Sequence, residues 1–411
     1  MRAGAAPSDD PFRARCYPPA VPPSTAVDAP ARPPSTALRA VRRPFEQLDP
    51  AAWDALAAAS PWATPFSSWA FHRAWWDGYG ANAHEETLVL VPADGPDDAD
   101  PVAIIPLMHR HEVEPRDLEL HTAIRHGEGL ELTPVPADAK ALFFGASYHA
   151  DYATILGAPE RMAAAAEAFA EYCAAGGDPE HPQPWDAVDL RRLRTGDPAL
   201  AALSEAFGRR EMEQGWTLNV EPEEVCPVAA LPEGASMDEF LGTLGKKERH
   251  EIRRKVRRAE AAGEVRLEPS ADLLADLPEF IDLHQRRWGD DGLFPDTEGG
   301  AQSRRFFERL FELAGGDGPL RLAFLTVGGR RVAACVSFDT GDACLYYNAG
   351  VDPDARELSP GVVMVERLVE RAVERGARRI DFLRGNEPYK YEWGAADSPI
   401  WRLLVRRTVP R

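Results

Sequence analysis

The sequence predicts a mixed α/β protein of the α+β class, with two domains that each hold a mixed, mostly antiparallel sheet flanked by helices. The chain has 411 residues, of which 44% are hydrophobic, and a single core seldom grows beyond roughly 250 to 300 residues. The same order of elements also occurs twice: helices, antiparallel strands, and then a strand, a helix and a strand. We therefore expect an N-terminal domain at 41–225 and a C-terminal domain at 226–411.

Hydrophobic periodicity and the turn residues between periodic runs define the individual elements. In the first half we expect helices at 49–60 and 66–80, a hairpin of strands at 86–95 and 101–113, a strand at 142–157, a helix at 161–177 and a strand at 185–193. In the second half we expect helical segments at 237–263, 271–289 and 302–316, an antiparallel meander over 320–352, a helix at about 360–375 and a strand at 377–385. A crossover helix requires this last strand to run parallel to the end of the meander.

Composition limits the partners and the compartment. The formal net charge is −19, from 47 basic and 66 acidic residues, which argues against general binding to nucleic acid or to an anionic membrane. The five cysteines are scattered without metal-binding spacing, so we expect reduced, mostly buried thiols in a cytoplasmic protein and no metal site. No stretch approaches the roughly 20 apolar residues of a membrane span. Residues 1–40 are rich in Pro, Ala, Ser and Thr, which predicts a disordered leader.

The stretch DARELSPGVVMVERL, residues 354–368, raises the first functional question. Ser359 and Pro360 are typical of a helix start, but the first turn carries no acidic residue to complement the helix dipole. The N–H groups of Gly361, Val362 and Val363, with Arg356 just upstream, would suit a bound phosphate. A plain Ser-Pro cap explains the same residues. The position of this helix after a strand, as a crossover, favours the phosphate interpretation.

Three blocks in the second half carry a family resemblance. Residues 346–394, preceded by 283–294 and 244–260, resemble the CelD/BcsL type of GNAT-like acyltransferase, and PFSSWAFHRAWW and GASYHADYATIL resemble its N-terminal half. The resemblance runs from about residue 45 to the end of the chain. It implies two GNAT-like folds in tandem, as in the Fem aminoacyl transferases, with a degenerate N-terminal copy on the acceptor side and a complete C-terminal copy on the donor side.

The resemblance also implies the chemistry. It predicts an acyl-CoA-dependent N- or O-acyltransferase, with acetyl-CoA as co-substrate and no permanently bound cofactor, acting on a sugar or a cell-envelope or exopolysaccharide precursor. The general pyrophosphate loop of the superfamily has the form Gln/Arg-x-x-Gly-x-Gly/Ala. Residues 356–364 keep an Arg, a Gly and the helix start but lack the second small residue.

Direct transfer in a ternary complex needs a general base, N–H donors for the carbonyl oxygen and an acid for the leaving thiolate. Tyr391 is the predicted acid, although Tyr389 and Tyr391 would equally suit packing against the sheet. His284 is the predicted base, with packing on Trp288 as the alternative. Asp381 is a second candidate base, or the ion-pair partner of a nearby arginine.

The donor and acceptor sites are predicted from further residues. Arg356, Ser359, Gly361, Val362 and Val363 are expected to bind the donor's phosphates. Lys390 either joins them or faces solvent.

On the acceptor side, His149 and Asp151 either form a turn or line a cleft between the domains, and Arg287 and Arg384 are the predicted substrate-binding cations. The basic segment 246–258 is either a solvated face or a surface for an anionic ligand.

Two other functions remain open. A Fem-like enzyme would use aminoacyl-tRNA as donor, and the basic segment would then bind RNA, which is otherwise an unlikely partner for so acidic a chain. Alternatively, a degenerate pair of GNAT folds would be an inactive glycan-binding or scaffold subunit. Binding of CoA and its effect on stability distinguish these interpretations.

Overall fold

The computed structural model describes residues 37–110, 132–135, 139–176, 185–315 and 318–407. Thr36–Arg411 form one compact unit. The expected leader lies outside the described residues except for its last four, and the first strand already begins at Leu38. Cys16 also lies outside them, and the four cysteines inside are free and buried, as expected. No helix in the described ranges is long and apolar enough to cross a membrane.

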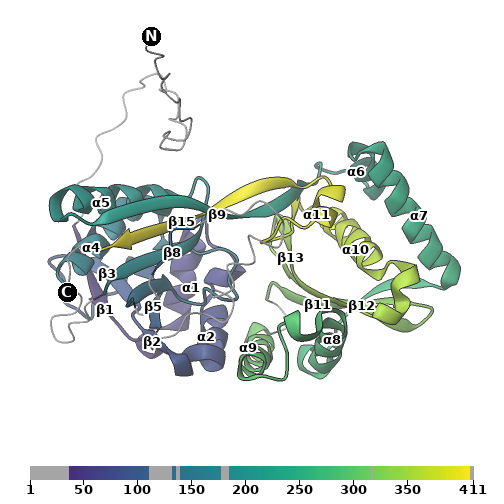
Figure 1. Cartoon of the computed structure of the whole chain (residues 1–411), viewed down its shortest axis with the longest axis horizontal. Coiled ribbons are helices and arrows are strands. Elements are labelled where there is room, and N and C mark those ends of the chain that lie inside the picture. Colours follow the sequence, from purple (N-terminus) through teal and green to yellow (C-terminus); the bar gives the residue numbers. More distant parts are fainter. Residues whose placement is uncertain (1–36, 111–131, 136–138, 177–184, 316–317, 408–411) are drawn as a thin grey trace, which may run out of the picture. The chain divides into compact units, whose positions relative to one another are not determined.

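Helices flank the sheets in both halves of the chain (Figure 1). In the first half they are α1 (Pro50–Ala59), α2 (Trp69–Tyr79), α4 (Met162–Ala174) and α5 (Pro198–Gln214). In the second half they are α6 (Met237–Thr243), α7 (Lys246–Ala262), α8 (Leu273–Trp288), α9 (Glu298–Ala314), α10 (Pro360–Glu374) and α11 (Pro388–Glu392).

The strands form two sheets. The smaller has the order β1-β3-β4-β7, from β1 (Leu38–Arg42), β3 (Leu88–Pro92), β4 (Ala103–Ile105) and β7 (Leu156–Gly157). The larger has the order β10-β11-β12-β13-β14-β9-β15-β8-β6-β5-β2. Its strands are β2 (Ala83–Glu85), β5 (Leu107–Arg110), β6 (Ala141–Phe144), β8 (Ala187–Arg194), β9 (Thr217–Ala230), β10 (Val265–Pro269), β11 (Leu320–Val327), β12 (Arg330–Asp339), β13 (Ala343–Val351), β14 (Arg379–Asp381) and β15 (Ala396–Arg406).

The same crossover unit occurs in each half. In the second half the predicted meander β11-β12-β13 leads through α10 to β14, which pairs with β13 in parallel. In the first half β6 leads through α4 to β8, and these two strands are also parallel. Neighbouring strands are otherwise antiparallel. The predicted α+β fold class, with mostly antiparallel strands and flanking helices, is confirmed.

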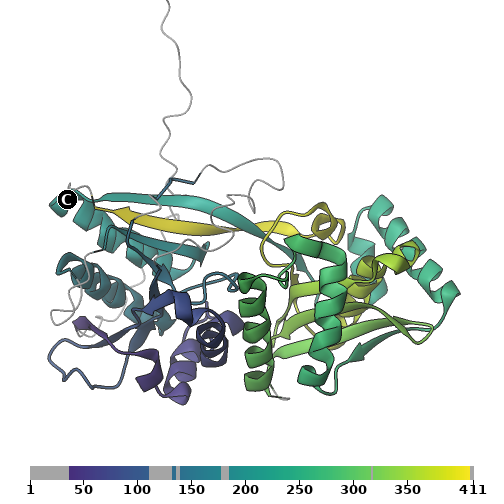
Figure 2. The same cartoon turned by 60° about the horizontal axis from the view of Figure 1, so that its bottom comes forward.

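Two long strands join the halves. β9 pairs with β14 at its end and with β15 along nearly its whole length, and β15 pairs on its other side with β8 (Figures 1 and 2). The side chain of Arg402 on β15 is 1% exposed and donates to the Asp189 carboxylate on β8 at 2.6 and 2.7 Å and to Glu221 on β9 at 2.8 Å. The predicted domain boundary at 225/226 falls inside β9. β15, the last strand in the described ranges, pairs with β8 and so completes the sheet of the first half.

Some elements differ from the sequence predictions. Only the two ends of the predicted strand 142–157 are extended as β6 and β7, because Ala146 adopts a positive φ of 61° and the chain forms a loop between them. The predicted helical segment 237–263 is two helices, because Leu244 is extended and buried between them. The sequence patterns did not assign α5, β9, β10 or β15.

Helices cover both faces of the sheet around β12 and β13. α8 packs on one face and α10 on the other, while α9 packs against α2 of the first half (Figure 2). Gly350 of β13 allows α8 to approach closely, because a Cβ there would lie 2.5 Å from the carbonyl carbon of Leu283 and 2.8 Å from the Cα of His284. This contact fixes the position of His284 beside the strand.

Gly350→Ala tests this close approach. The added methyl group would clash with main-chain atoms of α8, which cannot move without distorting the helix. The free energy of unfolding should therefore fall by about 2 kcal/mol. Thermal or denaturant unfolding measures the effect. Gly341→Ala is the matched control, since nothing lies within 4 Å of a Cβ at that position. Equal stability of the two variants would contradict the close approach of α8.

Candidate active site

A cleft opens where two parallel strands part. β13 and β14 pair only at Ala343–Leu345 and Arg379–Asp381. Beyond these residues β14 ends, whereas β13 continues through a bulge in its register with β12 that leaves Tyr347 unpaired. The cleft between the separated ends has a volume of about 950 Å³. Its walls include residues 346–349 from β13, 382–385 after β14, the start of α10 and part of the loop after β6.

The turn after β14 is strained and firmly held. Leu383 has a φ of 56°, in the left-handed region that β- and γ-branched side chains seldom adopt. Its N–H donates to Asp381 Oδ1 at 2.9 Å. Lys390 Nζ donates to the carbonyl oxygens of Leu383, Arg384 and Gly385 at 3.1, 2.6 and 2.9 Å. These bonds hold the wall of the cleft in a conformation that the chain would not adopt by itself.

Two sequence predictions are corrected by this arrangement. Lys390 is buried, and its ammonium binds these three carbonyl oxygens and Glu387 at 2.9 Å, so it neither faces solvent nor has hydrogens left for a phosphate. Asp381 does not line the cleft. Its carboxylate accepts from Tyr152 Oη at 2.8 and 3.0 Å, and burial raises its pKa to about 6. Both side chains hold the turn, and of the two only Lys390 also lines the cleft.

The start of α10 lines the other end of the cleft. Ser359 has a φ of 53° and does not cap the helix with its side chain; its Oγ accepts from Arg258 Nη2 at 2.6 Å. The carbonyl oxygen of Ser359 accepts from the N–H groups of Val362 and Val363 at 3.0 and 3.2 Å. The prediction of three free amides is therefore wrong for these two valines, and Val363 is fully buried outside the cleft.

The amide of Gly361 has no acceptor among the described residues, and two cations lie near it. A Cβ at Gly361 would be 3.9 Å from Arg287 Nη1 and 3.8 Å from Val351 Cγ1. Arg287 and Arg356 are exposed, line the cleft, and have no ion pair in the described ranges. Arg287 also lies over the ring of Trp288, 4.7 Å from its centroid. This end of the cleft presents two arginine side chains and a main-chain N–H.

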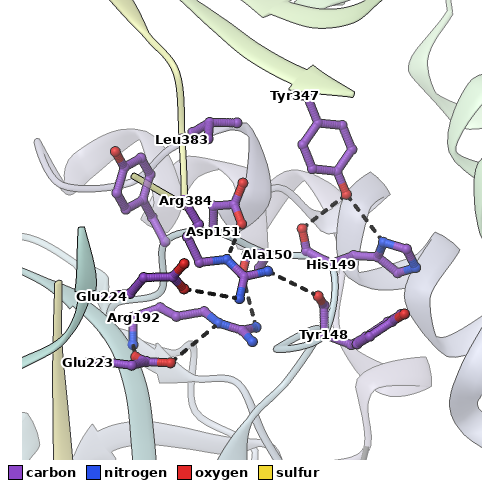
Figure 3. Close-up of polar contacts among 12 residues, drawn as sticks. Tyr148, His149, Ala150, Asp151, Arg192, Glu223, Glu224, Tyr347, Leu383 and Arg384 are labelled. Carbon is purple, nitrogen blue, oxygen red and sulfur yellow. Dashed lines mark hydrogen bonds and ion pairs between the residues drawn. The ribbon is translucent and has the colours of Figure 1, made fainter. Parts of the chain in front are cut away.

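The opposite end of the cleft is built partly by the first half of the chain. Tyr148, His149 and Asp151 lie on the loop after β6 and line the cleft. Arg384, beside the strained turn, forms an ion pair with Asp151 (Figure 3). The structure therefore brings the two predicted acceptor residues of the first half together with Arg384 of the second half.

The two histidines of the cleft are differently engaged. The ring nitrogens of His149 lie 2.8 Å from Tyr79 Oη and 3.4 Å from Tyr347 Oη, and its ring stacks on Phe306 at 4.1 Å. His284 is buried and lines the cleft, with Nδ1 3.4 Å from Gln285 Oε1. Its ring packs edge-on against Phe294, and the Trp288 ring is 6.3 Å away. His284 therefore packs among aromatic rings and also lines the cleft, and its role as a general base stays a prediction.

The predicted acid, Tyr391, is outside the cleft. It is 37% exposed and its hydroxyl donates to Asp397 at 2.6 Å. Tyr389 lines the cleft instead, and burial raises the pKa of its hydroxyl. Side chains two positions apart in a helix point about 200° apart around its axis. Only one of Tyr389 and Tyr391 can therefore face the cleft. Tyr389 therefore replaces Tyr391 as the tyrosine that can reach a substrate.

Sequence analysis also missed Glu224, which lines the cleft from β9. The pKa of its carboxyl is raised to about 7, mainly by burial. The positive charge of Arg384 lowers this pKa, whereas the negative charges of Glu223 and Asp151 raise it. The acidic run EPEEV would have been a signal only if β9 had been assigned, since buried carboxylates are rare without a partner or a function. No cluster of three or more metal-ligating side chains forms in the described ranges.

The role of Lys390 in holding the turn can be tested by Lys390→Met. The substitution keeps the aliphatic volume but leaves three carbonyl oxygens and Glu387 without their donor, which should cost roughly 3 kcal/mol of stability. The unfolding midpoint measures the loss, and Glu392→Gln, an exposed change on the same helix, is the control. An unchanged midpoint for Lys390→Met would mean that the turn does not depend on this ammonium.

Comparisons with known proteins agree with this geometry. Residues 246–391 match the model of the acetyltransferase (GNAT) domain. Among solved structures, FemX has a TM-score of 0.54 at 12% identity, covering 89% of this chain and 96% of that one. L-PGS from Bacillus licheniformis has a TM-score of 0.50 at 11% identity, covering 88% and 93%.

A conserved protein of unknown function from Bacteroides thetaiotaomicron VPI-5482 also has a TM-score of 0.50, at 11% identity, covering 87% and 98%. No curated protein matches the chain. The structural likenesses extend over both halves of the chain, whereas the domain match is confined to the second half, where β13, β14 and α10 form the cleft. The protein is an acyltransferase with a GNAT domain, in a two-part fold that FemX shares.

Proposed function

We propose that this protein transfers an acyl group, most simply acetyl, from acyl-CoA to an amine or hydroxyl group of a sugar or of a cell-envelope or exopolysaccharide precursor. The resemblance to the CelD/BcsL type suggests this acceptor class and a cytoplasmic location. The observation that carries the proposal is one continuous cleft, which joins the start of α10, with Arg287 and Arg356 beside it, to the loop of the first half. Donor and acceptor would meet there in a ternary complex.

The donor end suits a phosphorylated thioester carrier. Among the described residues, 346–351 of β13 have no strand partner on the side that β14 leaves, so an extended amide-containing arm can add to β13 as a further strand would. The free Gly361 amide, Arg287 and Arg356 lie where such an arm would end in a phosphate. The second half is thus the donor side, and the loop of the first half that carries Tyr148, His149 and Asp151 is the acceptor side.

Tyr389 is the proposed acid for the leaving thiolate, because it is the tyrosine of α11 that lines the cleft. His284 remains a candidate base. Attack by the acceptor forms a tetrahedral intermediate on the thioester carbonyl, and its collapse breaks the C–S bond. Exclusion of water by the surrounding aromatic side chains would limit hydrolysis of the thioester.

Substitution of Gly361 tests the donor assignment. Gly361→Asp places bulk and negative charge beside the phosphate position, so the dissociation constant for CoA should rise at least tenfold in calorimetry or thermal-shift titration. Gly361→Ala is the matched control for fold, because its Cβ makes only ordinary contacts, and it should bind CoA more tightly than the Asp variant. Unchanged CoA affinity in folded Gly361→Asp would refute this donor site, and absence of CoA binding by the parent protein would favour a scaffold function.

A second candidate donor, aminoacyl-tRNA, is favoured by α7. Several exposed or half-buried cations on this helix have no ion pair in the described ranges: Lys246, Lys247, Lys255 and Arg257. α7 packs against α10 and contacts the cleft rim through Arg258 and Ser359. A polyanion bound along α7 could therefore place its end in the cleft.

Charge reversal on α7 separates the two donors. If tRNA is the donor, binding should weaken steeply with salt, and Lys247→Glu with Arg257→Glu should reduce both the affinity and the salt slope. CoA affinity should respond much less to these exposed positions. Arg305→Glu, an exposed cation on α9 without an ion pair in the described ranges, is the control. Tight CoA binding without salt-dependent tRNA binding would rule out the second candidate.

A further inference from the structure

An aromatic ring lies partly uncovered in the wall of the cleft. Of the large hydrophobic side chains that are exposed in the described ranges, only Trp288 lines the cleft, and it is 38% exposed. On α8 this residue continues the row of Leu277, Phe280 and His284, which are buried. Residues at this spacing lie on one side of a helix. Trp288 is therefore on the inward side of α8, and the surface that it leaves uncovered belongs to the cleft.

The Trp288 ring is held in one orientation. The guanidinium carbon of Arg287 lies 4.7 Å from the ring centroid, and the indole N–H donates to the carbonyl oxygen of Ala349 on β13 at 3.4 Å. Directly after Trp288, Gly289 has a φ of 56° and ends α8. A ring that is already fixed has little side-chain entropy left to lose when a flat ligand stacks on it. Trp288 thus offers a preorganised surface for stacking.

The groups beside the ring are suited to phosphates. Arg287 reaches from the ring to the start of α10, where its Nη1 would lie 3.9 Å from a Cβ at Gly361. Arg356 lines the same end of the cleft, and neither arginine forms an ion pair in the described ranges. Guanidinium groups and a main-chain N–H both donate hydrogen bonds to phosphate oxygens. A stacking surface and a set of phosphate ligands are therefore neighbours, joined by Arg287.

We propose that Trp288 stacks on the adenine base of the donor, so that the enzyme recognises the donor by its base as well as by its phosphates. One ribose separates base and phosphate in a nucleotide, so the two subsites must be neighbours, as Trp288 and Arg287 are. This inference rests on the proposed acyl-CoA-dependent function and deepens it. It names the residue that would distinguish acyl-CoA from an acyl group on protein-bound phosphopantetheine, which has the same arm and a phosphate but no base.

Other ligands use only part of this end of the cleft. A neutral sugar can stack on an indole, but it leaves both arginines without an anion. A long acyl chain would cover the ring and also leave the arginines unpaired. A purine nucleotide engages the ring, the cations and the N–H together. Removal of an aromatic side chain that stacks a base weakens binding by roughly 5- to 150-fold, which is large enough to measure.

Trp288→Ala tests the stacking directly. Purified full-length protein is titrated in a calorimeter with CoA and, separately, with 4′-phosphopantetheine, which lacks the base. The substitution should raise the dissociation constant for CoA about tenfold or more and change that for 4′-phosphopantetheine less than twofold. Trp288→Phe keeps an aromatic face and should recover most of the CoA affinity. Leu274→Ala is the control, because Leu274 is an exposed apolar side chain on the same helix but outside the cleft.

The possible failures are distinguishable. Unchanged CoA affinity in folded Trp288→Ala, or an equal loss for CoA and 4′-phosphopantetheine, overturns this inference and leaves the proposed function in place. Absence of CoA binding by the parent protein contradicts the proposed function itself. If the parent binds 4′-phosphopantetheine too weakly to measure, recovery of CoA affinity in Trp288→Phe decides, and no recovery counts against stacking.

A fluorescence measurement covers the case in which Trp288→Ala does not fold. A stacked base quenches indole emission, so saturating CoA should quench the parent protein more than Trp288→Phe. The difference between the two proteins isolates Trp288 from the other nine tryptophans of the chain. Equal fractional quenching of the two proteins would overturn the assignment of Trp288.

Discussion

The short pairing between β13 and β14 is the constraint on which the site depends. Three residues from each strand hold the sheet together, and beyond them the strands separate. The separation requires a bulge at Tyr347 on one strand and a left-handed residue, Leu383, after the other. Such a residue costs of order 1–3 kcal/mol. Asp381 and Lys390 supply hydrogen bonds that hold this turn, which explains why two ionisable side chains are buried there.

The acceptor end depends on a second constraint: the strands β9 and β15 run from one half of the chain into the other. β15 leaves the second half and completes the sheet of the first, with Arg402 buried between Asp189 and Glu221. This brings β9, and with it Glu224, between the two halves. The loop after β6 supplies Asp151 to Arg384 across the same boundary. The site is therefore composite, and a fragment containing the GNAT domain match alone would lack part of its wall.

Local patterns in the sequence predicted the crossover unit well and the site only partly. The meander, α10 and β14 follow from periodicity and turn residues, which act over a few positions. The small and polar stretch around His149 and Asp151 was expected either to form a turn or to line a cleft, and it forms a loop that lines the cleft. Errors arose where the outcome depends on direction or on distant partners. The direction in which each residue of the short helix α11 points decides whether Tyr389 or Tyr391 lines the cleft. Lys390 is buried because its ammonium donates to the carbonyl oxygens of a strained turn. Glu224 lines the cleft only because β9 lies between residues of both halves.

The cleft carries different charged side chains at its two ends, and this follows from its two constraints together. The start of α10 contributes a free main-chain N–H beside Arg287 and Arg356, whereas the opposite end has one carboxylate more than it has guanidinium groups. Charges act more strongly in such a partly dehydrated space than at an exposed surface. In the proposed reaction the end with Arg287 and Arg356 would hold the anionic donor, even though the chain as a whole carries a net charge of −19.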